Sequence, residues 1–386
     1  MTRDLRLLAL SLFLWGVGEG LFFYLQPIYL TELGADPLQV GVVLSLAGAA
    51  MTVTHIPAGA LADRFGRKSL MSAAWIFGAL SCFLMFLASS LWLFVAALLL
   101  YSLTGFVMSP MSSYVTEARG PWSVGRALTT VGASFNAGAV IGPVAGGLLA
   151  ARLGIRPLFA IAAVLFVLST VAMILLGKQP VEPSHAEGRY RSLFSNRTAA
   201  RILIVTFIAI LAMTLSWPLT PLYMSEVQGL TVAQVGALGS FFSLGIVILN
   251  LTLGVSPARR GSMIAQGLVA GSVVLLWKGM SFPAYAAGYF LAGGSRTARS
   301  LLSAQVERVV ERPQLGLAFG VAETVASSSL ILAPVLAGLL YQNNNPAAPY
   351  PVGLVLIGLS LGLSAWLLPA DRESPSAALP MLEIER

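Results

Sequence analysis

Long apolar segments follow one another along almost the whole chain, and they constrain the fold more than any other feature of the sequence. From Leu5 to Leu368, apolar runs of about 20 residues are separated only by short polar or Gly/Pro-rich loops. A helix of that length crosses the ~30 Å hydrocarbon core of a bilayer. Only 10% of the residues are charged, whereas soluble domains carry about 25%. The sequence therefore predicts an all-α membrane protein without a sizeable soluble domain.

The apolar runs predict about twelve transmembrane helices in two groups of six. The predicted spans are 6–31, 38–61, 69–89, 91–117, 127–151, 155–177, 201–226, 232–254, 262–280, 283–309, 316–341 and 349–369. The longest polar stretch, 178–200, separates the two groups. The predicted organisation is an N-terminal six-helix half (1–177), a cytoplasmic linker (178–200), a C-terminal six-helix half (201–369) and a cytoplasmic tail (370–386).

The distribution of Lys and Arg predicts how the helices are oriented. Most basic residues fall in loops on one side, whereas the other side has only Arg152, Arg156 and Lys278. Cytoplasmic loops retain positive charge, so both termini are expected in the cytoplasm of a multi-pass protein, with a bacterial inner membrane favoured. The net charge of +7 then follows from topology and requires no nucleic-acid partner.

An internal repeat relates the two groups of helices. The stretch "QPIYLTELGADPLQVG" aligns with "TPLYMSEVQGLTVAQVG" after one inserted residue, and it pairs Pro27 with Pro221, Tyr29 with Tyr223, Glu32 with Glu226 and Gln39 with Gln234. Two repeated halves predict a substrate path between them, on a pseudo-two-fold axis.

The loop after the second predicted span carries a recognisable motif. Its sequence "GALADRFGRKSL" contains Gly59, Leu61, Asp63, Arg64, Gly66, Arg67 and Lys68. These residues match the pattern Gly-x-Leu-x-Asp-Arg-x-Gly-Arg-Lys, which the chain shares with the loop between helices two and three of the major facilitator superfamily (MFS). The resemblance extends over essentially the whole chain, and it implies two pseudo-symmetric six-helix halves that transport by alternating access.

The resemblance also implies a role for this loop as a conformational latch, formed by Gly59, Asp63, Arg64, Gly66, Arg67 and Lys68. In the family the loop bridges the two halves and stabilises one of the alternating states. Asp63 is expected against a helix N-terminus, where the partial positive charge favours an acid. The alternative is a simple positive-inside anchor, which explains the basic residues but not the acid and the two glycines.

A second motif lies in the fifth predicted helix and comprises Gly138, Gly142, Pro143, Gly146 and Gly147. It resembles the fifth-helix signature of the family's antiporters and drug exporters, and it therefore favours export. Close helix packing without any meaning for direction is the alternative. The arginine that many proton-coupled exporters carry in helix four is missing, because Tyr101 and Thr104 precede Gly105.

Among the ionisable residues of the predicted spans, four stand out as candidates, namely Glu19, Arg296, Arg299 and Glu323. Such residues are costly in hydrocarbon and usually line a cavity or pair with one another. Since helices one, four, seven and ten line the central cavity in the family, the resemblance places Glu19 and both arginines there. Glu19 is predicted to carry a proton or contact a cation, and Arg296 to bind an anionic group or hold a carboxylate. A fixed ion pair of Arg296 with Glu19 or Glu323 is the alternative.

Aromatic and amide residues complete the predicted substrate or proton path, which adds Tyr24, Gln26, Tyr101, Asn136 and Trp217. Motifs for hydrolysis, metal binding and nucleotide phosphates were sought and not found in the sequence. We therefore expect a protein that is not an enzyme, holds no cofactor and draws on an ion or substrate gradient.

The sequence predicts a monomeric secondary transporter in the lipid bilayer that exports small amphipathic or drug-like molecules in exchange for protons. Two alternatives remain open. One is an importer of a sugar, an organic anion or a nucleoside, which Arg296 and Arg299 favour. The other is a lipid flippase on the same fold.

Overall fold

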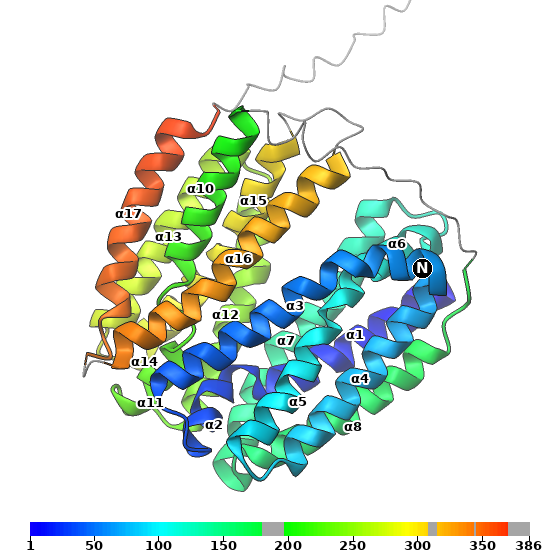
Figure 1. Cartoon of the computed structure of the whole chain (residues 1–386), viewed down its shortest axis with the longest axis horizontal. Helices are drawn as coiled ribbons and strands as arrows, with labels where there is room; N and C mark the ends of the chain where they lie inside the picture. The colour runs from blue at the N-terminus through cyan, green and yellow to red at the C-terminus, as the bar shows by residue number, and fades with distance from the viewer. Residues whose placement is uncertain (180–196, 308–314, 343–344, 370–386) are drawn as a thin grey trace, which may run out of the picture.

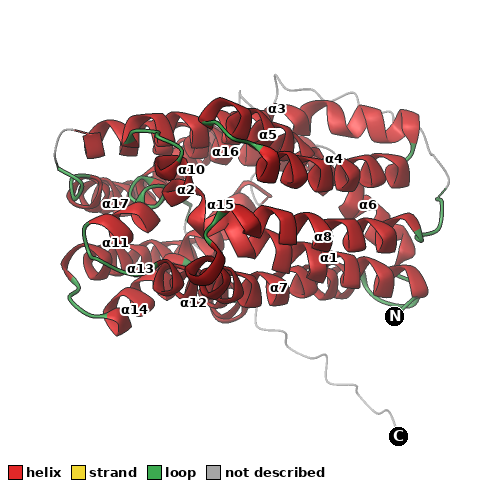
Figure 2. Cartoon of the chain, turned by 90° about the horizontal axis from the view of Figure 1, so that it is seen from below, coloured by secondary structure: helices red, strands yellow, loops and turns green. Residues whose placement is uncertain are grey.

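The computed structural model describes residues 1–179, 197–307, 315–342 and 345–369, and side chains are described throughout these ranges except at 55–63, 108–109, 307 and 315–320. Regular structure in these ranges is helical (Figure 2), as predicted. Most of the predicted linker and tail lies outside the described residues. The division of the chain into two halves at 178–200 stays a prediction.

The first group of helices precedes the linker (Figure 1). It consists of α1 (Arg3–Phe22), α2 (Gln26–Glu32), α3 (Pro37–Phe65), α4 (Arg67–Leu87), α5 (Leu91–Leu103), α6 (Met108–Ala118), α7 (Val124–Leu153) and α8 (Arg156–Ile174). Short 3₁₀ turns at Phe23–Leu25 and Thr104–Val107 join α1 to α2 and α5 to α6.

The second group follows the linker. It consists of α10 (Arg197–Thr214), α11 (Thr220–Glu226), α12 (Val232–Leu253), α13 (Ala258–Lys278), α14 (Phe282–Ala292), α15 (Gly294–Glu307), α16 (Leu315–Gln342) and α17 (Pro349–Leu367). In the described residues, eleven spans are long and apolar enough to cross a membrane. The tenth predicted span, 283–309, differs because it is divided into α14 and α15 at Gly293, and α15 carries two arginines.

The two groups of helices meet through two pairs of long helices. Contacts join α7 to α12 and α3 to α16, and α2 also touches α11. Helix α3 begins and α16 ends on the face of the molecule that carries residues 33–36 and 345–348, which we call the far face. The opposite face carries the N-terminus and the ends of α3, α6 and α12, and we call it the terminal face. In Figure 1 the terminal-face ends of the second group, such as those of α10 and α17, lie at the top, whereas α6 and the N-terminus of the first group lie to the right. The two groups therefore spread apart toward this face.

Close approaches between the groups are concentrated toward the far face. A Cβ added at Gly147 would lie 3.0 Å from the Cα of Gly236, and a Cβ at Gly338 would lie 3.0 Å from the Cα of Leu38. The backbone N–H of Val144 donates to the Ser240 hydroxyl at 3.1 Å. The structure therefore has the far face closed by direct packing, while the helix ends at the terminal face diverge.

The same local device begins α3 and α12, in agreement with the internal repeat. The Asp36 carboxylate accepts from the Gln39 backbone N–H at 2.8 Å, and the Gln39 side chain accepts from the Asp36 N–H at 3.0 Å. Thr231 and Gln234 make the equivalent reciprocal pair at 3.3 and 2.9 Å. Such capping boxes satisfy N–H groups that a helix start would otherwise leave unpaired.

A buried polar cluster holds α1, α4 and α8 together. The hydroxyls of Ser11 and Ser169 lie 2.8 Å apart, and the Trp75 indole N–H reaches them at 2.8 and 2.7 Å. Ser11 and Ser169 have no exposed surface, and Trp75 is buried. Since a bilayer offers no water to replace these bonds, the cluster fixes the register of the three helices.

Replacing both Ser11 and Ser169 with alanine is expected to leave the Trp75 N–H unpaired in the core. An orphaned buried donor costs about 1–3 kcal/mol, so the thermal unfolding midpoint of the purified protein should fall clearly. The control is Ser134→Ala, because the Ser134 hydroxyl bonds only to the Thr130 carbonyl of its own helix at 3.2 Å. Equal midpoints for the double variant and the control would contradict a stabilising role for the cluster.

Candidate functional site

Four spans are interrupted along their length, and they occupy equivalent places in the order of helices. These are the first (α1 and α2), the fourth (α5 and α6), the seventh (α10 and α11) and the tenth (α14 and α15). A glycine or proline lies within two residues of each break, and such residues either permit or enforce a local departure from helical geometry. Interrupted membrane helices at corresponding positions commonly build the binding site of a transporter. The interruptions therefore direct attention to the residues around them.

Glu19 lies on α1, one turn before the first break. The Tyr101 hydroxyl and the Trp15 indole N–H are within hydrogen-bonding reach of its carboxyl group, and Arg296 from the second group is within electrostatic range. The fully buried thiol of Cys82 is a further neighbour. Trp15 itself stacks on Phe166, with ring centroids 4.0 Å apart. Aromatic side chains therefore surround the Glu19 carboxyl group on one side, and Glu19 itself is only partly buried.

Arg296 lies on α15, just after the break in the tenth span. Its side chain is exposed, and its guanidinium makes no hydrogen bond or ion pair with the described residues. Its charged and polar neighbours within electrostatic range are Arg299, Tyr24, Glu19 and Glu323. No ion pair within 4.0 Å joins Arg296 to either acid in the described residues. Because Glu19 and Tyr24 belong to the first group, Arg296 faces the space between the two groups.

The second arginine of the pair has a direct partner. The Arg299 Nη2 atom lies 2.5 Å from Glu323 Oε2, so the ion pair of Glu323 is with Arg299 and not with Arg296. The alternative of a fixed Arg296–Glu323 pair is therefore wrong in this structure. The reason is the register between α15 and α16, which places Glu323 beside Arg299.

Aromatic residues close the far side of this region. The Tyr24 hydroxyl lies 3.3 Å from the Ser243 hydroxyl across the two groups, and a Cβ added at Gly239 would meet the Tyr24 ring. Phe242 packs edge-on against Tyr24 and stacks on Trp217, with centroids 6.0 and 4.3 Å apart. These residues form a continuous layer between Glu19 and the far face.

The remaining predicted path residues are less informative. Gln26 is buried at the start of α2, and Asn136 is half-buried on α7. The sequence analysis missed Trp15 and Ser243, which contact Glu19 and Tyr24. Trp15 could have been found because it precedes Glu19 by four residues and so lies on the same face of α1. No pattern in the sequence points to Ser243.

The latch residues belong to the end of α3 and the start of α4, at the terminal face. Gly66 has φ of +83°, a conformation that glycine adopts without strain, and it ends one helix and begins the next. Arg67 donates to the Gln179 side chain at 3.5 Å, and Lys68 donates to the Leu176 carbonyl. Arg64 is exposed, whereas the side chains of 55–63, which include Gly59 and Asp63, lie outside the described residues. The described latch contacts thus reach the end of the first group and the start of the linker, at Leu176 and Gln179, and not the second group.

The glycines of α7 pack on two different partners. A Cβ at Gly138, Gly142 or Gly146 would collide with the backbone of α1, which itself has Gly16 and Gly20 at this seam. Gly147 lies one residue on, and its Cβ would lie 2.9 Å from the Ala233 carbonyl oxygen of α12. A Cβ added at Gly20 would lie 2.8 Å from the Pro143 ring. The motif therefore joins α7 to α1 and also to the other group of helices.

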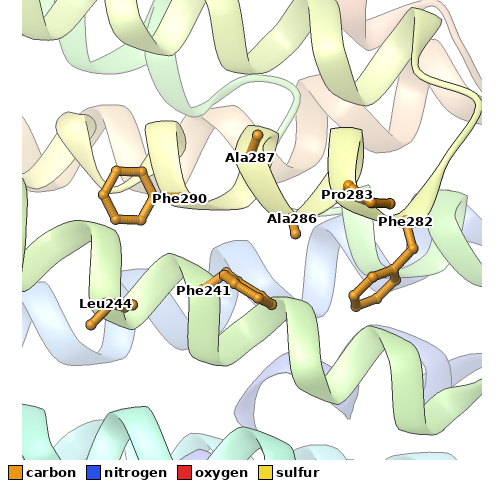
Figure 3. Close-up of a pocket in the computed structure, with 7 residues that line it drawn as sticks. All are labelled: Phe241, Leu244, Phe282, Pro283, Ala286, Ala287 and Phe290. Atoms are coloured by element: carbon orange, nitrogen blue, oxygen red, sulfur yellow. The ribbon is translucent and has the colours of Figure 1, made fainter.

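An apolar groove lies elsewhere, between α12 and α14 (Figure 3). Its volume is about 440 Å³, and it is lined by Phe241, Leu244, Phe282, Pro283, Ala286, Ala287 and Phe290. None of the predicted path residues belongs to it. Its side chains carry no polar atoms, so it is suited to apolar matter rather than to charge recognition.

Comparisons with known sequences agree with the geometry. The sequence profile of the Major Facilitator Superfamily matches residues 8–200 and 202–384. The chain is 31% identical over 242 residues to the multidrug resistance protein MdtG of Escherichia fergusonii and 33% identical over 242 residues to that of Salmonella arizonae. Each match covers 59% of this chain. The chain in turn spans 58% and 59% of the length of these two curated relatives.

Solved structures of similar fold cover nearly the whole chain. The nucleoside transporter NupG has a TM-score of 0.76 at 16% identity, covering 95% of this chain and 98% of NupG. A bacterial homolog of the human lysosomal transporter Spinster, inward-facing and occupied, has a TM-score of 0.73 at 14% identity, covering 97% and 98%. The human organic anion transporter MFSD10 has a TM-score of 0.69 at 18% identity, covering 94% and 99%. These likenesses show the fold, and together with the profile they show that the chain belongs to the Major Facilitator Superfamily.

Proposed function

We propose that this secondary transporter exports small amphipathic, drug-like molecules in exchange for protons, with Glu19 and Arg296 at the centre of its substrate and proton path. The observation that carries the proposal is the placement of an acid and an unpaired arginine from opposite groups of helices around the same space. Membership of a transporter family agrees with the prediction that the chain is not an enzyme.

Two further observations support export. The relatives in Escherichia and Salmonella are named for multidrug resistance. The aromatic side chains near Glu19 and Arg296, namely Trp15, Tyr24, Tyr101 and Trp217, offer large apolar surfaces beside two charges. An amphipathic molecule matches that combination, because its apolar part packs on rings while its polar part meets the charges.

The orientation in the membrane is part of the proposal. With the termini in the cytoplasm of a bacterial inner membrane, the diverging terminal face is the inward side, and the closed far face is the outward side. The described arrangement then corresponds to the state that receives a substrate for export.

One observation favours a second candidate, the import of an organic anion. The Arg296 guanidinium has no hydrogen-bond or ion-pair partner in the described residues, and such a group attracts carboxylates and phosphates. In this alternative, protons move in the same direction as the substrate, or do not move at all.

The test is proton flux in proteoliposomes that contain a pH-sensitive dye. Lipophilic cations, lipophilic neutral compounds, sugars and organic anions are added in turn. We expect lipophilic compounds to drive proton counterflow. The reason is that a bound substrate lowers the affinity of Glu19 for its proton, and the proton lowers the affinity for the substrate to the same degree. Flux of an organic anion or a sugar alone, with protons moving in the same direction or not at all, would contradict export and establish the import candidate.

A further inference from the structure

The two arginines of α15 differ in their surroundings although they lie one turn apart. Arg299 donates from Nε to Glu323 Oε2 at 3.1 Å and from Nη2 to the same oxygen at 2.5 Å. Its Nη2 atom also donates to the Ser327 hydroxyl at 3.1 Å. The other carboxylate oxygen, Glu323 Oε1, accepts from the Ser303 hydroxyl at 3.3 Å. Both ends of the ion pair are therefore hydrogen-bonded by the opposite helix.

This arrangement is reciprocal, and we call it the charge clamp. Helix α15 supplies Arg299 and, one turn later, Ser303, and α16 supplies Glu323 and, one turn later, Ser327. Ser303 and Ser327 are buried, and the Arg299 side chain is 14% exposed against 51% for Glu323. Charge-assisted hydrogen bonds of this kind are stronger than neutral ones. The clamp thus cancels the charge of Arg299 in place.

Arg296 has no such compensation. It lies one turn closer to the break at Gly293, its side chain is exposed, and its guanidinium has no bonded partner in the described residues. Arg299 and Glu323 are both within its electrostatic range. Without Glu323, the region would present two like charges, separated by one helical turn, to the same space.

We propose that Glu323 is a specificity-determining residue, which neutralises Arg299 so that Arg296 is left as a single unpaired cation and substrates with one anionic group are selected over those with two. This inference rests on the proposed function, in which Arg296 lies in the substrate site. Glu323 acts through Arg299, so it is a positioning residue and needs no contact with the substrate.

The test is calorimetric binding of a matched series of compounds to the purified full-length protein in lipid nanodiscs. The series consists of naphthylmethanol, naphthoate and naphthalene dicarboxylate, which share one ring system and carry zero, one and two negative charges. The wild type is expected to bind the monoanion most tightly. In Glu323→Gln, the released Arg299 should raise the affinity for the dianion relative to the monoanion about tenfold, the effect of one hydrogen bond to a charged group.

Three variants separate the effect of charge from a general disturbance. The double variant Glu323→Gln/Arg299→Gln removes both charges and should restore the wild-type order. Ser303→Ala keeps the ion pair and should also retain that order. Arg299→Gln alone leaves Glu323 unpaired near Arg296, so the affinity for the monoanion should fall, and this variant gives an independent result if Glu323→Gln does not fold.

The outcomes distinguish this inference from the function on which it rests. Wild-type order in Glu323→Gln, or an unchanged monoanion affinity in Arg299→Gln, would overturn the charge clamp and leave the proposed site intact. Binding of the series that Arg296→Gln does not weaken would contradict the proposed site itself, whereas a wild type that does not bind the monoanion would overturn the charge clamp.

Discussion

The Glu19→Gln variant is expected to lose substrate-driven proton counterflow completely, down to the level of liposomes without protein. Glutamine keeps the size of the side chain and can still bond to Tyr101 and Trp15, the two neighbours of the carboxyl group. It cannot release or bind a proton, however, so substrate binding no longer has a protonation step to displace. Proteoliposome flux with an imposed pH gradient measures the effect, and residual substrate movement should no longer respond to that gradient.

The matched control for this prediction is Glu226→Gln. Glu226 lies at the far face, where the Tyr341 hydroxyl donates to its carboxylate at 3.2 Å, and it is remote from the break in the first span. We expect this variant to retain counterflow. Counterflow that survives in Glu19→Gln and disappears in Glu226→Gln would transfer the proton-carrying role to the far-face acid.

The Gly236→Leu variant is expected to abolish transport while leaving the protein folded. A Cβ at Gly236 would lie 2.6 Å from the Cα of Gly147 and 2.6 Å from the Pro143 carbonyl oxygen. Such contacts are backbone on backbone, so no side-chain rotation can relieve them. The far face could not close, whereas packing within each group of helices would be unaffected. Flux measurements in proteoliposomes and size-exclusion chromatography test the two parts of this prediction.

Thiol labelling tests the reason for the loss. Ser243→Cys, in a Cys82→Ala background, places a thiol beneath Tyr24, where the native hydroxyl is buried. A membrane-impermeant reagent added from the far side should label it in Gly236→Leu but not in the parent. The control is Gly358→Leu, because a Cβ at Gly358 meets nothing within 4 Å. Normal flux and no labelling in Gly236→Leu would show that the far face tolerates a side chain there.

The sequence was sufficient to predict features that depend on local composition. Apolar run length predicted the all-helical membrane fold, and the loop around Gly66 predicted the family, both of which are confirmed. Glu19 was recognisable as a candidate because an ionisable residue inside an apolar run is rare, whereas the single span predicted around Arg296 is divided at Gly293. The roles of these residues as proton and anion sites stay predictions.

Pairing between helices was beyond the reach of the sequence. The i, i+3 spacing of Arg296 and Arg299 places both on one face of α15, but it does not say which of them meets an acid of α16. Which arginine forms the ion pair depends on the position of α16 along the axis of α15. Many small side-chain contacts between the two helices set that position, and no sequence motif encodes it. The break at Gly293 was missed for a similar reason, since Gly293 is fitted against the Gly245 backbone of α12.

The concentration of inter-group contacts at one end has a mechanical consequence. Helix α3 has 29 residues, which at 1.5 Å per residue makes a lever about 43 Å long. If it pivots near its far-face end, a tilt of about 10° moves the other end by about 7 Å, enough to admit a small molecule. Glycines bring the backbones of α1 and α7 into contact along a second seam, and such close packing holds these two helices together as one unit. A long helix that is packed against the other group mainly near one end would thus convert small adjustments around Tyr24 and Gly239 into a larger opening at the terminal face.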